Sequence, residues 1–358
     1  MMDWKFLSNQ QPRKRNAEQD AKKAEYESGT MANKRDGTLD ATTLRPGNRL
    51  LRVMMMVAVM TGSSAFTSGK DPELSVHFID VGGDATLFHV GDAAVLIDAG
   101  TESRGPMVLD YIRKLGIEDF DLMIGSHPHQ DHIGGLTTIL RNMPVAKVLQ
   151  TGKALGNMYD YGKKVAADFQ KAVEDSDAEV VLARAGQHYD VGPLSIDILH
   201  PAEETLERHT INNSSIVCRI TFGEIRFMMT GDAGDVGYGA EPEILRRYYD
   251  PDSDDPLAAL RADILKVSQH GGDWGITDPF LAAVSPEVAV IPVGKGKPLR
   301  HPSQAILDRL RSAGVETYRG GLHGHVVITT DGHTYSIKTE RVPDPDKIFR
   351  MALPEDRE

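Results

Sequence analysis

The sequence contains a single cysteine, Cys218, and no apolar run long enough to cross a bilayer. One cysteine excludes both an internal disulfide framework and a cysteine-rich zinc knuckle. A membrane-spanning helix needs roughly 18 or more apolar residues in succession, and no segment of the chain provides them. We therefore expect no integral membrane domain.

Positive charge is scarce in most of the chain. The formal net charge is −12 at pH 7, and because residues 1–52 carry 11 Lys or Arg against 7 Asp or Glu, the remainder carries −16. An acidic surface repels nucleic acid as a bulk polyanion. DNA is therefore a possible but disfavoured partner, although a metal-lined cleft could still hold one phosphodiester.

The first 70 residues differ from the rest in composition. Residues 1–48 are polar and charged without apolar periodicity, which is typical of a disordered segment. In residues 49–66 two arginines precede an apolar run and then small residues, an order typical of a signal peptide; a start at Met31 would give it a basic region of usual length. We expect export to the periplasm or the cell exterior. The alternative is a cytoplasmic protein whose disordered leader contains a chance apolar patch.

From about Leu74 onward, short apolar runs alternate with Gly and Asp, as in strands joined by tight turns. The predicted strands are 75–80, 85–90, 94–98, 122–125, 179–182, 195–199, 215–222, 226–230, 263–267, 288–293, 316–318 and 325–330. The predicted helices are 106–115, 159–175, 241–249 and 303–313. No linker interrupts this pattern, so we predict one domain over residues 71–343 and a loosely held tail over 344–358.

Four potential metal ligands lie within six residues, directly after the predicted strand 122–125. His127 and His129 are two positions apart in extended chain, so their side chains point to the same side, and Pro128 keeps the segment out of a helix. Asp131 and His132 add a carboxylate and a further imidazole. These donors suit zinc, with manganese or iron as substitutes, and the cluster predicts a centre for two metal ions.

The segment His127-Pro-His129-Gln-Asp131-His132 resembles the H-x-H-x-D-H signature of the metallo-β-lactamase superfamily. More narrowly, the chain resembles the domain at the C-terminus of ComEC-type DNA-uptake proteins. Further matching pieces follow in the expected order at 77–82, 84–85, 96–100, 212–215, 230–232, 262–271 and 301–303. The resemblance implies an α/β fold, an αββα sandwich of two mixed β-sheets flanked by helices, with the metals at one edge.

The resemblance also implies which residues bind the two zinc ions. The implied ligands are His127 and His129 for one ion, Asp131, His132 and His270 for the other, and Asp232 as a bridge between them. The superfamily's usual third histidine on the first ion is replaced by Asn212-Asn213, as in ComEC-like relatives. One ion is therefore expected to have few protein ligands.

Other residues are candidates for catalysis or substrate binding. Asp131 and His301 are the candidate catalytic residues; His301 precedes a predicted helix and could act as an acid or a phosphate contact, or could simply cap a packed loop. Asn213 and Ser215 could bind substrate or close a turn. His200 has a suitable spacing for a ligand, but its strand comes too early in the fold, so we expect a structural role.

Some further side chains have expected supporting roles. Asp80, Asp84 and Asp98 are expected to orient metal-binding histidines or to fix loops. Cys218 shares a strand face with two isoleucines and is expected to be a buried apolar residue. A basic rim for a nucleic-acid substrate could come from Lys266, Lys295, Lys297 and Arg300.

These residues predict a metal-dependent hydrolase. Two zinc ions close together lower the pKa of a bound water towards about 7, which provides a hydroxide nucleophile at neutral pH. Because ComEC-like relatives are linked to nuclease action and to phosphorylcholine ester cleavage, we expect a small-molecule or polymeric phosphate mono- or diester as substrate. The alternatives are an amide or thioester hydrolase of the β-lactamase type, and a non-catalytic DNA-uptake accessory protein that keeps the fold.

Overall fold

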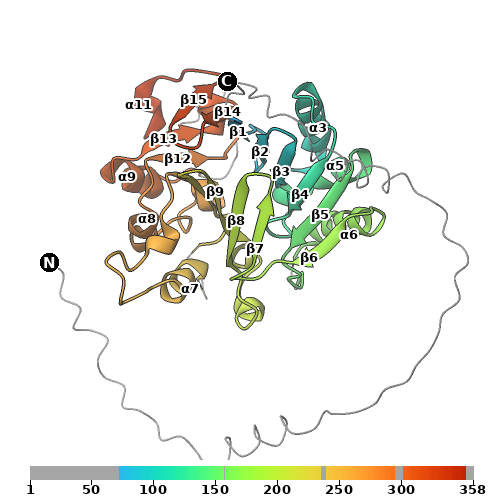
Figure 1. Cartoon of the computed structure of the whole chain (residues 1–358), viewed down its shortest axis with the longest axis horizontal. Helices are drawn as coiled ribbons and strands as arrows, with labels where there is room; N and C mark the ends of the chain where they lie inside the picture. Colours follow the sequence, from blue (N-terminus) through green and yellow to red (C-terminus); the bar gives the residue numbers. More distant parts are fainter. Residues whose placement is uncertain (1–71, 157, 235–238, 295–300, 352–358) are drawn as a thin grey trace, which may run out of the picture. The chain divides into compact units, whose positions relative to one another are not determined.

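Two β-sheets packed face to face form the centre of the molecule, as the computed structural model in Figure 1 shows. The structure describes residues 72–156, 158–234, 239–294 and 301–351. The predicted leader and its signal-like segment lie outside these residues, as do Lys295, Lys297 and Arg300. None of the helices in the described ranges is both long and apolar enough to span a membrane.

The first sheet has eight strands among the described residues, in the order β15-β14-β1-β2-β3-β4-β5-β6. Its strands are β1 (Leu74–Phe78), β2 (Thr86–Val90), β3 (Ala93–Ile97), β4 (Phe120–Ile124), β5 (Val145–Gln150), β6 (Glu179–Leu182), β14 (Val326–Thr330) and β15 (Tyr335–Thr339). Strands β3 to β6 run parallel to one another, whereas the pairings from β15 to β3 are antiparallel. The sheet is therefore mixed, as predicted.

The second sheet has seven strands within the described part of the chain, in the order β13-β12-β11-β10-β9-β8-β7. Its strands are β7 (His188–Val191), β8 (Leu194–His200), β9 (Val217–Phe222), β10 (Ile225–Met229), β11 (Ile264–Lys266), β12 (Val288–Ile291) and β13 (Glu316–Arg319). Strands β10 to β13 are parallel, and β7 to β10 are antiparallel. Both sheets thus contain a parallel block whose strand ends can carry a site.

Side-chain alternation along the strands explains the four layers. Leu122 and Ile124 of β4 belong to the apolar core between the sheets, whereas Met123 between them packs on the helix side. On β10, Phe227 likewise faces the core between the sheets and Met228 faces the opposite helices. A strand buried on both faces must be apolar at every position, which is why these segments form continuous apolar runs.

Helices cover the outer face of each sheet. The α-helices are α3 (Gly105–Lys114), α4 (Gln130–Ile133), α5 (Leu136–Asn142), α6 (Asp160–Glu174), α7 (Ala240–Arg247), α8 (Asp278–Val284), α9 (Gln304–Ser312), α10 (Gly320–His323) and α11 (Pro345–Ile348). The apolar sides of α3, α5 and α6 pack on the first sheet, and those of α7, α8 and α9 pack on the second. The predicted αββα sandwich is confirmed.

The sequence patterns missed several short elements. Strands β5, β7 and β15 were not predicted. Strands β7 and β15 lie at sheet edges, where one side of the strand is open and polar residues are tolerated, whereas β5 lies between β4 and β6. The end of the chain also differs from the predicted loose tail. Through residue 351 it is anchored, since the Arg319 guanidinium donates hydrogen bonds to the carbonyls of Lys347, Ile348 and Arg350.

Candidate metal centre

The turn after β4 carries the first two histidines of the predicted centre. His127 follows the buried strand end, and His129 is the extended residue that precedes α4. Their rings meet, with Nε2 of His127 3.0 Å from Nδ1 of His129. The prediction that this i, i+2 pair points to one side is confirmed.

The one-turn helix α4 brings the next two candidates to the same place. Asp131 and His132 lie on α4, and two glycines follow at Gly134 and Gly135. A Cβ at Gly135 would lie 2.0 Å from the carbonyl oxygen of Ala99, so only glycine lets the turn between α4 and α5 approach the end of β3 this closely. This close approach presses α4, with its two ligand candidates, against the sheet edge.

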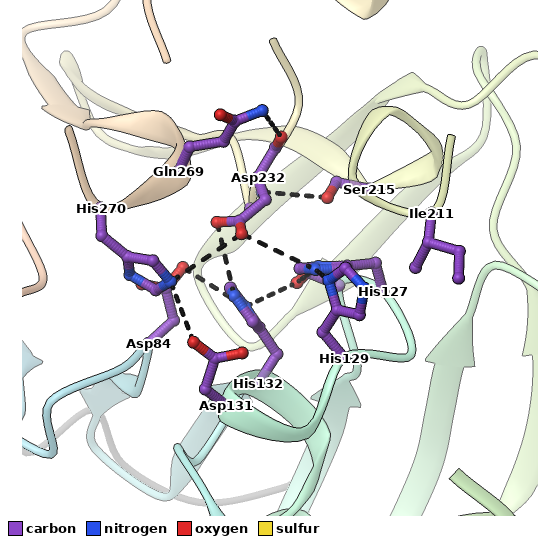
Figure 2. A network of polar contacts seen from close by, with 12 residues as sticks. Asp84, His127, His129, Asp131, His132, Ile211, Ser215, Asp232, Gln269 and His270 are labelled. Carbon is purple, nitrogen blue, oxygen red and sulfur yellow. Dashed lines mark hydrogen bonds and ion pairs between the residues drawn. The ribbon is translucent and has the colours of Figure 1, made fainter. Parts of the chain in front are cut away.

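Asp232 and His270 reach the centre from the second sheet. Asp232 follows β10 and His270 follows β11, and these two strands are parallel neighbours, so their carboxyl ends share one edge. Asp232 carboxylate oxygens lie 3.4 Å from Nε2 of His132 and 3.8 Å from Nε2 of both His127 and His270. Nε2 of His270 lies 3.3 Å from Asp131, and Figure 2 shows the side chains converging on Asp232.

The six side chains divide into two neighbouring triplets. His127, His129 and Asp232 form one, and Asp131, His132 and His270 form the other; within each, one nitrogen or oxygen per residue lies within 4.8 Å of the others. Sequence resemblance assigned these same residues to two ions. The structure brings all six together.

Backbone strain is concentrated at this centre. Asp98, Gln269 and His270 have positive φ angles of 56°, 49° and 52°, in the left-handed region that non-glycine residues rarely occupy. Each such residue costs of order 1–3 kcal/mol, and strained residues cluster at functional sites. The fold therefore accepts an unfavourable backbone conformation in the His270 loop, which indicates that the position of the His270 side chain matters for function.

The inward-facing atoms of the centre have the properties of metal ligands. Nε2 of His132, Nε2 of His270 and Oδ1 of Asp232 are buried without a hydrogen-bond partner. The opposite nitrogen of each ring is held: Nδ1 of His132 donates to Asp98 and Nδ1 of His270 donates to the carbonyl of Pro292, both at 2.8 Å. Metal-binding histidines are usually fixed in this way, with the second nitrogen bonded to a carboxylate or a backbone carbonyl. The donor set therefore fits a metal centre.

Electrostatics at the centre also favours a cation. Burial lowers the pKa of His270, but the carboxylates of Asp232 and Asp84 outweigh it and raise that pKa to about 9. The pKa of His132 is raised well above its usual value, because Asp232, Asp84 and Asp98 outweigh burial. In contrast, burial and the neighbouring His132 lower the pKa of His127 well below its usual value. The buried carboxylates thus draw positive charge to the second triplet.

Lys266 is not part of a basic rim, which corrects that prediction. Its side chain is buried, forms an ion pair with the buried Asp84, and donates to the carbonyl of Gly231. The pKa of Asp84 is lowered, since Lys266 and the nearby His132 outweigh the effect of burial. Lys266 therefore neutralises a carboxylate beneath the centre instead of contacting a polyanion at its mouth.

Asn213 and Ser215 close a turn, so their assignment as substrate-binding residues is corrected. Both are fully buried. The Asn213 side-chain oxygen accepts the backbone N–H of Gly234 at 3.0 Å, and the Ser215 hydroxyl oxygen accepts that of Asp232 at 2.9 Å. These bonds hold the segment that carries Asp232. Asn213 and Ser215 therefore close a turn, the alternative to substrate binding.

Other predicted residues lie around the centre. The half-buried His301 packs against Gly272, where an added Cβ would lie 2.7 Å from its Cε1, so it adjoins the loop of His270. Its role in catalysis stays a prediction. The buried, apolar environment predicted for Cys218 is confirmed, and burial raises its thiol pKa to about 12.

Asp98 supports the centre from below, as predicted. Its carboxylate accepts the backbone N–H and hydroxyl of Ser126 at 2.8 and 2.7 Å, and Nδ1–H of His132 at 2.8 Å. Sequence reasoning overlooked Ser126, although it directly precedes His127. Asp80 instead pairs with Arg341 and fixes the loops there.

We expect Asp98→Asn to lower metal affinity by about 10–100-fold, because the amide NH2 would replace one acceptor oxygen and face one or two of the three donors, which loosens the His132 ring. The measurement is a competition titration of the apoprotein with a zinc-sensitive dye. Asp121→Asn is the control, since Asp121 also accepts a backbone N–H but lies at the opposite end of β4. Equal affinity of the Asp98 variant and the control would contradict an orienting role.

Comparisons with known proteins agree with this site. The profile of the Metallo-beta-lactamase superfamily matches residues 79–295. The chain is 25% identical to ComE operon protein 3 of Bacillus subtilis over 274 residues, which are 71% of this chain and 33% of that protein. It is 26% identical to Recombination protein 2 of Haemophilus influenzae, over 68% of this chain and 27% of that one.

Competence protein ComA of Neisseria gonorrhoeae is 25% identical over 70% of this chain and 32% of its own length. The chain thus spans about a third of the length of these relatives. Among solved structures, the metallo-beta-lactamase fold protein YhfI of Bacillus subtilis aligns with a TM-score of 0.42 and 17% identity, over 75% of this chain and all of that one. The profile covers more than half of the chain, and all six clustered ligand candidates lie within the matched residues, so this protein belongs to the metallo-β-lactamase superfamily.

Proposed function

We propose that this protein is a two-metal hydrolase of phosphate esters, with phosphodiesters as the favoured class. The observation that carries the proposal is the pair of adjacent ligand triplets, whose inward atoms lack hydrogen-bond partners. His127, His129 and Asp232 would hold one ion, and Asp131, His132 and His270 the other, with Asp232 close enough to both triplets to bridge them. Zinc fits the imidazole and carboxylate donors, and manganese or iron are substitutes.

With both ions bound, the centre would supply Lewis-acid polarisation of a phosphoryl oxygen and activation of a water molecule at neutral pH. The side chains and backbone of the protein position the ligand histidines and provide a carboxylate for proton transfer. Asp98 and the Pro292 carbonyl fix the rings of His132 and His270. The Asp131 side chain is 28% exposed, in contrast to the buried His132 and Asp232, so it lies on the open side of the centre, where a carboxylate can accept or return a proton.

A cavity beside His127 offers room for the organic part of a substrate. Its volume is about 360 Å³, within the usual range for small-molecule sites. The wall contains His127 and Pro128 together with Lys153, Phe169 and Gln170. Apolar surface with a few polar groups suits an alcohol or nucleoside leaving group better than a long polyanion.

Two observations favour phosphate esters over β-lactams. By the family resemblance, Asn212-Asn213 stands where a typical β-lactamase of this superfamily has a third histidine. The names of two relatives, Recombination protein 2 and Competence protein ComA, refer to recombination and competence, which connects those proteins with nucleic acid. The complete set of six ligand candidates in turn argues against a non-catalytic accessory protein, because a degenerate site would lose some of them.

The test is turnover on a panel of four substrates. Purified full-length protein is assayed with bis-p-nitrophenyl phosphate, a phosphorylcholine ester, single-stranded DNA and nitrocefin, with and without chelator. We expect chelator-sensitive hydrolysis of at least one phosphate ester and restoration by zinc or manganese. His129→Ala should lose one metal equivalent and the activity with it.

Each adverse outcome has a clear meaning. Turnover that is absent from all four substrates, or that survives chelation, would rule out a metal-dependent hydrolase of this kind. A preference for nitrocefin would overturn the phosphate-ester assignment while keeping the metal centre. Unchanged metal content in His129→Ala would overturn the ligand assignment.

A further inference from the structure

A separate group of metal-type side chains lies outside the six-residue centre. His200 ends β8, His209 follows the short 3-10 helix Leu206–Arg208, and Glu243 lies on α7. All three are buried, with exposed fractions of 1%, 5% and 8%, and one ligand atom from each lies within 4.8 Å of the others. In Figure 1 the end of β8 and α7 lie at the same side of the second sheet.

The His200 ring has its unprotonated nitrogen aimed into this group. Its Nδ1 lies 3.0 Å from the carbonyl oxygen of Ser215, which can only accept, so Nδ1 carries the proton and donates it. Nε2 therefore presents a lone pair. This is the arrangement of His270 at the centre described above, whose Nδ1 also donates to a backbone carbonyl.

The remaining contacts place three potential ligand atoms together. Nε2 of His209 lies 3.3 Å from Nε2 of His200 and 3.2 Å from Oε2 of Glu243. Nε2 of His209 carries at most one proton, so it can donate to the Glu243 carboxylate or to Nε2 of His200, but not to both. The other Glu243 oxygen, Oε1, accepts from the Thr205 hydroxyl at 2.8 Å and lies 4.0 Å from the His200 nitrogen. A cation among them would displace the proton of the His209 nitrogen and be coordinated by both imidazoles and the buried carboxylate.

We propose that His200, His209 and Glu243 bind a further metal ion, with zinc as the favoured ion. Two histidines and one glutamate form an established three-ligand set for zinc. Two ligand atoms each about 2.05 Å from a tetrahedral ion lie about 3.3 Å apart, which matches the separations of 3.3 and 3.2 Å around His209. The set comes from three segments that no local sequence pattern connects.

The ion would have a structural role. Its ligands join the end of β8, the loop that follows it and α7, and the same loop continues to Ser215. The Ser215 carbonyl accepts from His200, and its hydroxyl oxygen accepts the backbone N–H of Asp232. An ion at this place would therefore stiffen the loop that positions Asp232. Its burial leaves no room for a substrate.

Metal content of the full-length protein tests the proposal. After zinc loading and desalting, zinc per chain is measured by mass spectrometry for the wild type and for Glu243→Gln. We expect the variant to lose one equivalent, because a neutral amide is a poor zinc ligand while it can still accept the Thr205 hydrogen bond. His129→Ala should lose a different equivalent, and the double variant should lose both. The matched control is Glu204→Gln, an exposed residue in the same loop, which should retain the wild-type content.

Equal zinc content in the wild type and Glu243→Gln would overturn the proposal, whatever happens at the six-residue centre. If Glu243→Gln does not fold, crystals of the wild type grown with zinc provide the second measurement. An anomalous peak among His200, His209 and Glu243 is the expected result, and a map without that peak would equally overturn the proposal.

Discussion

Asp232→Asn is expected to lower turnover at least about 100-fold and to remove metal from the centre. Loss of a group that merely orients a metal-binding histidine already costs about 10–100-fold, and Asp232 itself lies 3.4–3.8 Å from three of the histidines. The amide has the same shape but lacks the negative charge. The turn should survive, because Ser215 holds the backbone N–H of residue 232 and not its side chain.

The measurement combines zinc per chain with initial rates on whichever phosphate ester the wild type hydrolyses best. The Asp121→Asn protein again serves as the control, since it makes the same chemical change at the far end of a strand that leads to the centre. An Asp232→Asn protein that keeps its full zinc content and rate would show that this carboxylate is not a ligand.

Phe227→Ala is expected to lower the free energy of unfolding by about 3–5 kcal/mol, the usual cost of removing a buried aromatic ring. Phe227 of β10 is fully buried and meets Phe88 of β2 edge to face, with ring centroids 5.3 Å apart. The two rings belong to different sheets, so their contact joins the two halves of the sandwich. The cavity left by alanine would lie between the sheets, where neither can shift freely.

Urea unfolding followed by circular dichroism measures this loss. Tyr249→Ala is the control: its side chain is more than half exposed, and surface substitutions usually change stability by no more than about 0.5 kcal/mol. A loss for Phe227→Ala as small as that of the control would mean that the ring does not fill the core between the sheets.

The His127–His132 segment could be read from the sequence because its geometry is local. Two residues in extended chain point the same way whatever surrounds them, and the 3.0 Å contact between His127 and His129 follows from that rule. Asp232 and His270 were different. Nothing in their own segments separates a ligand from a turn residue, so only resemblance to a family assigned them.

Burial explains why the roles expected from the sequence for three polar residues were wrong. Asn213 and Ser215 have side chains that could bind a substrate, and Lys266 could contact a polyanion, yet all three lie beneath the surface. Each is occupied by a backbone group or a carboxylate from another part of the chain. Polarity alone cannot distinguish a residue that binds substrate from one that satisfies a buried turn.

By itself, the sequence determined most of the strand segments, the apolar runs that lie buried between layers, and the histidine cluster at the end of β4. The tertiary structure decided which distant residues join that cluster, because the parallel pairs β3–β4 and β10–β11 direct their carboxyl ends to a common edge. It also brought His200, His209 and Glu243 together. The physical reason is that periodicity and spacing act over a few residues, whereas a metal centre requires donors within a few ångströms from segments that only the packing of two sheets makes neighbours.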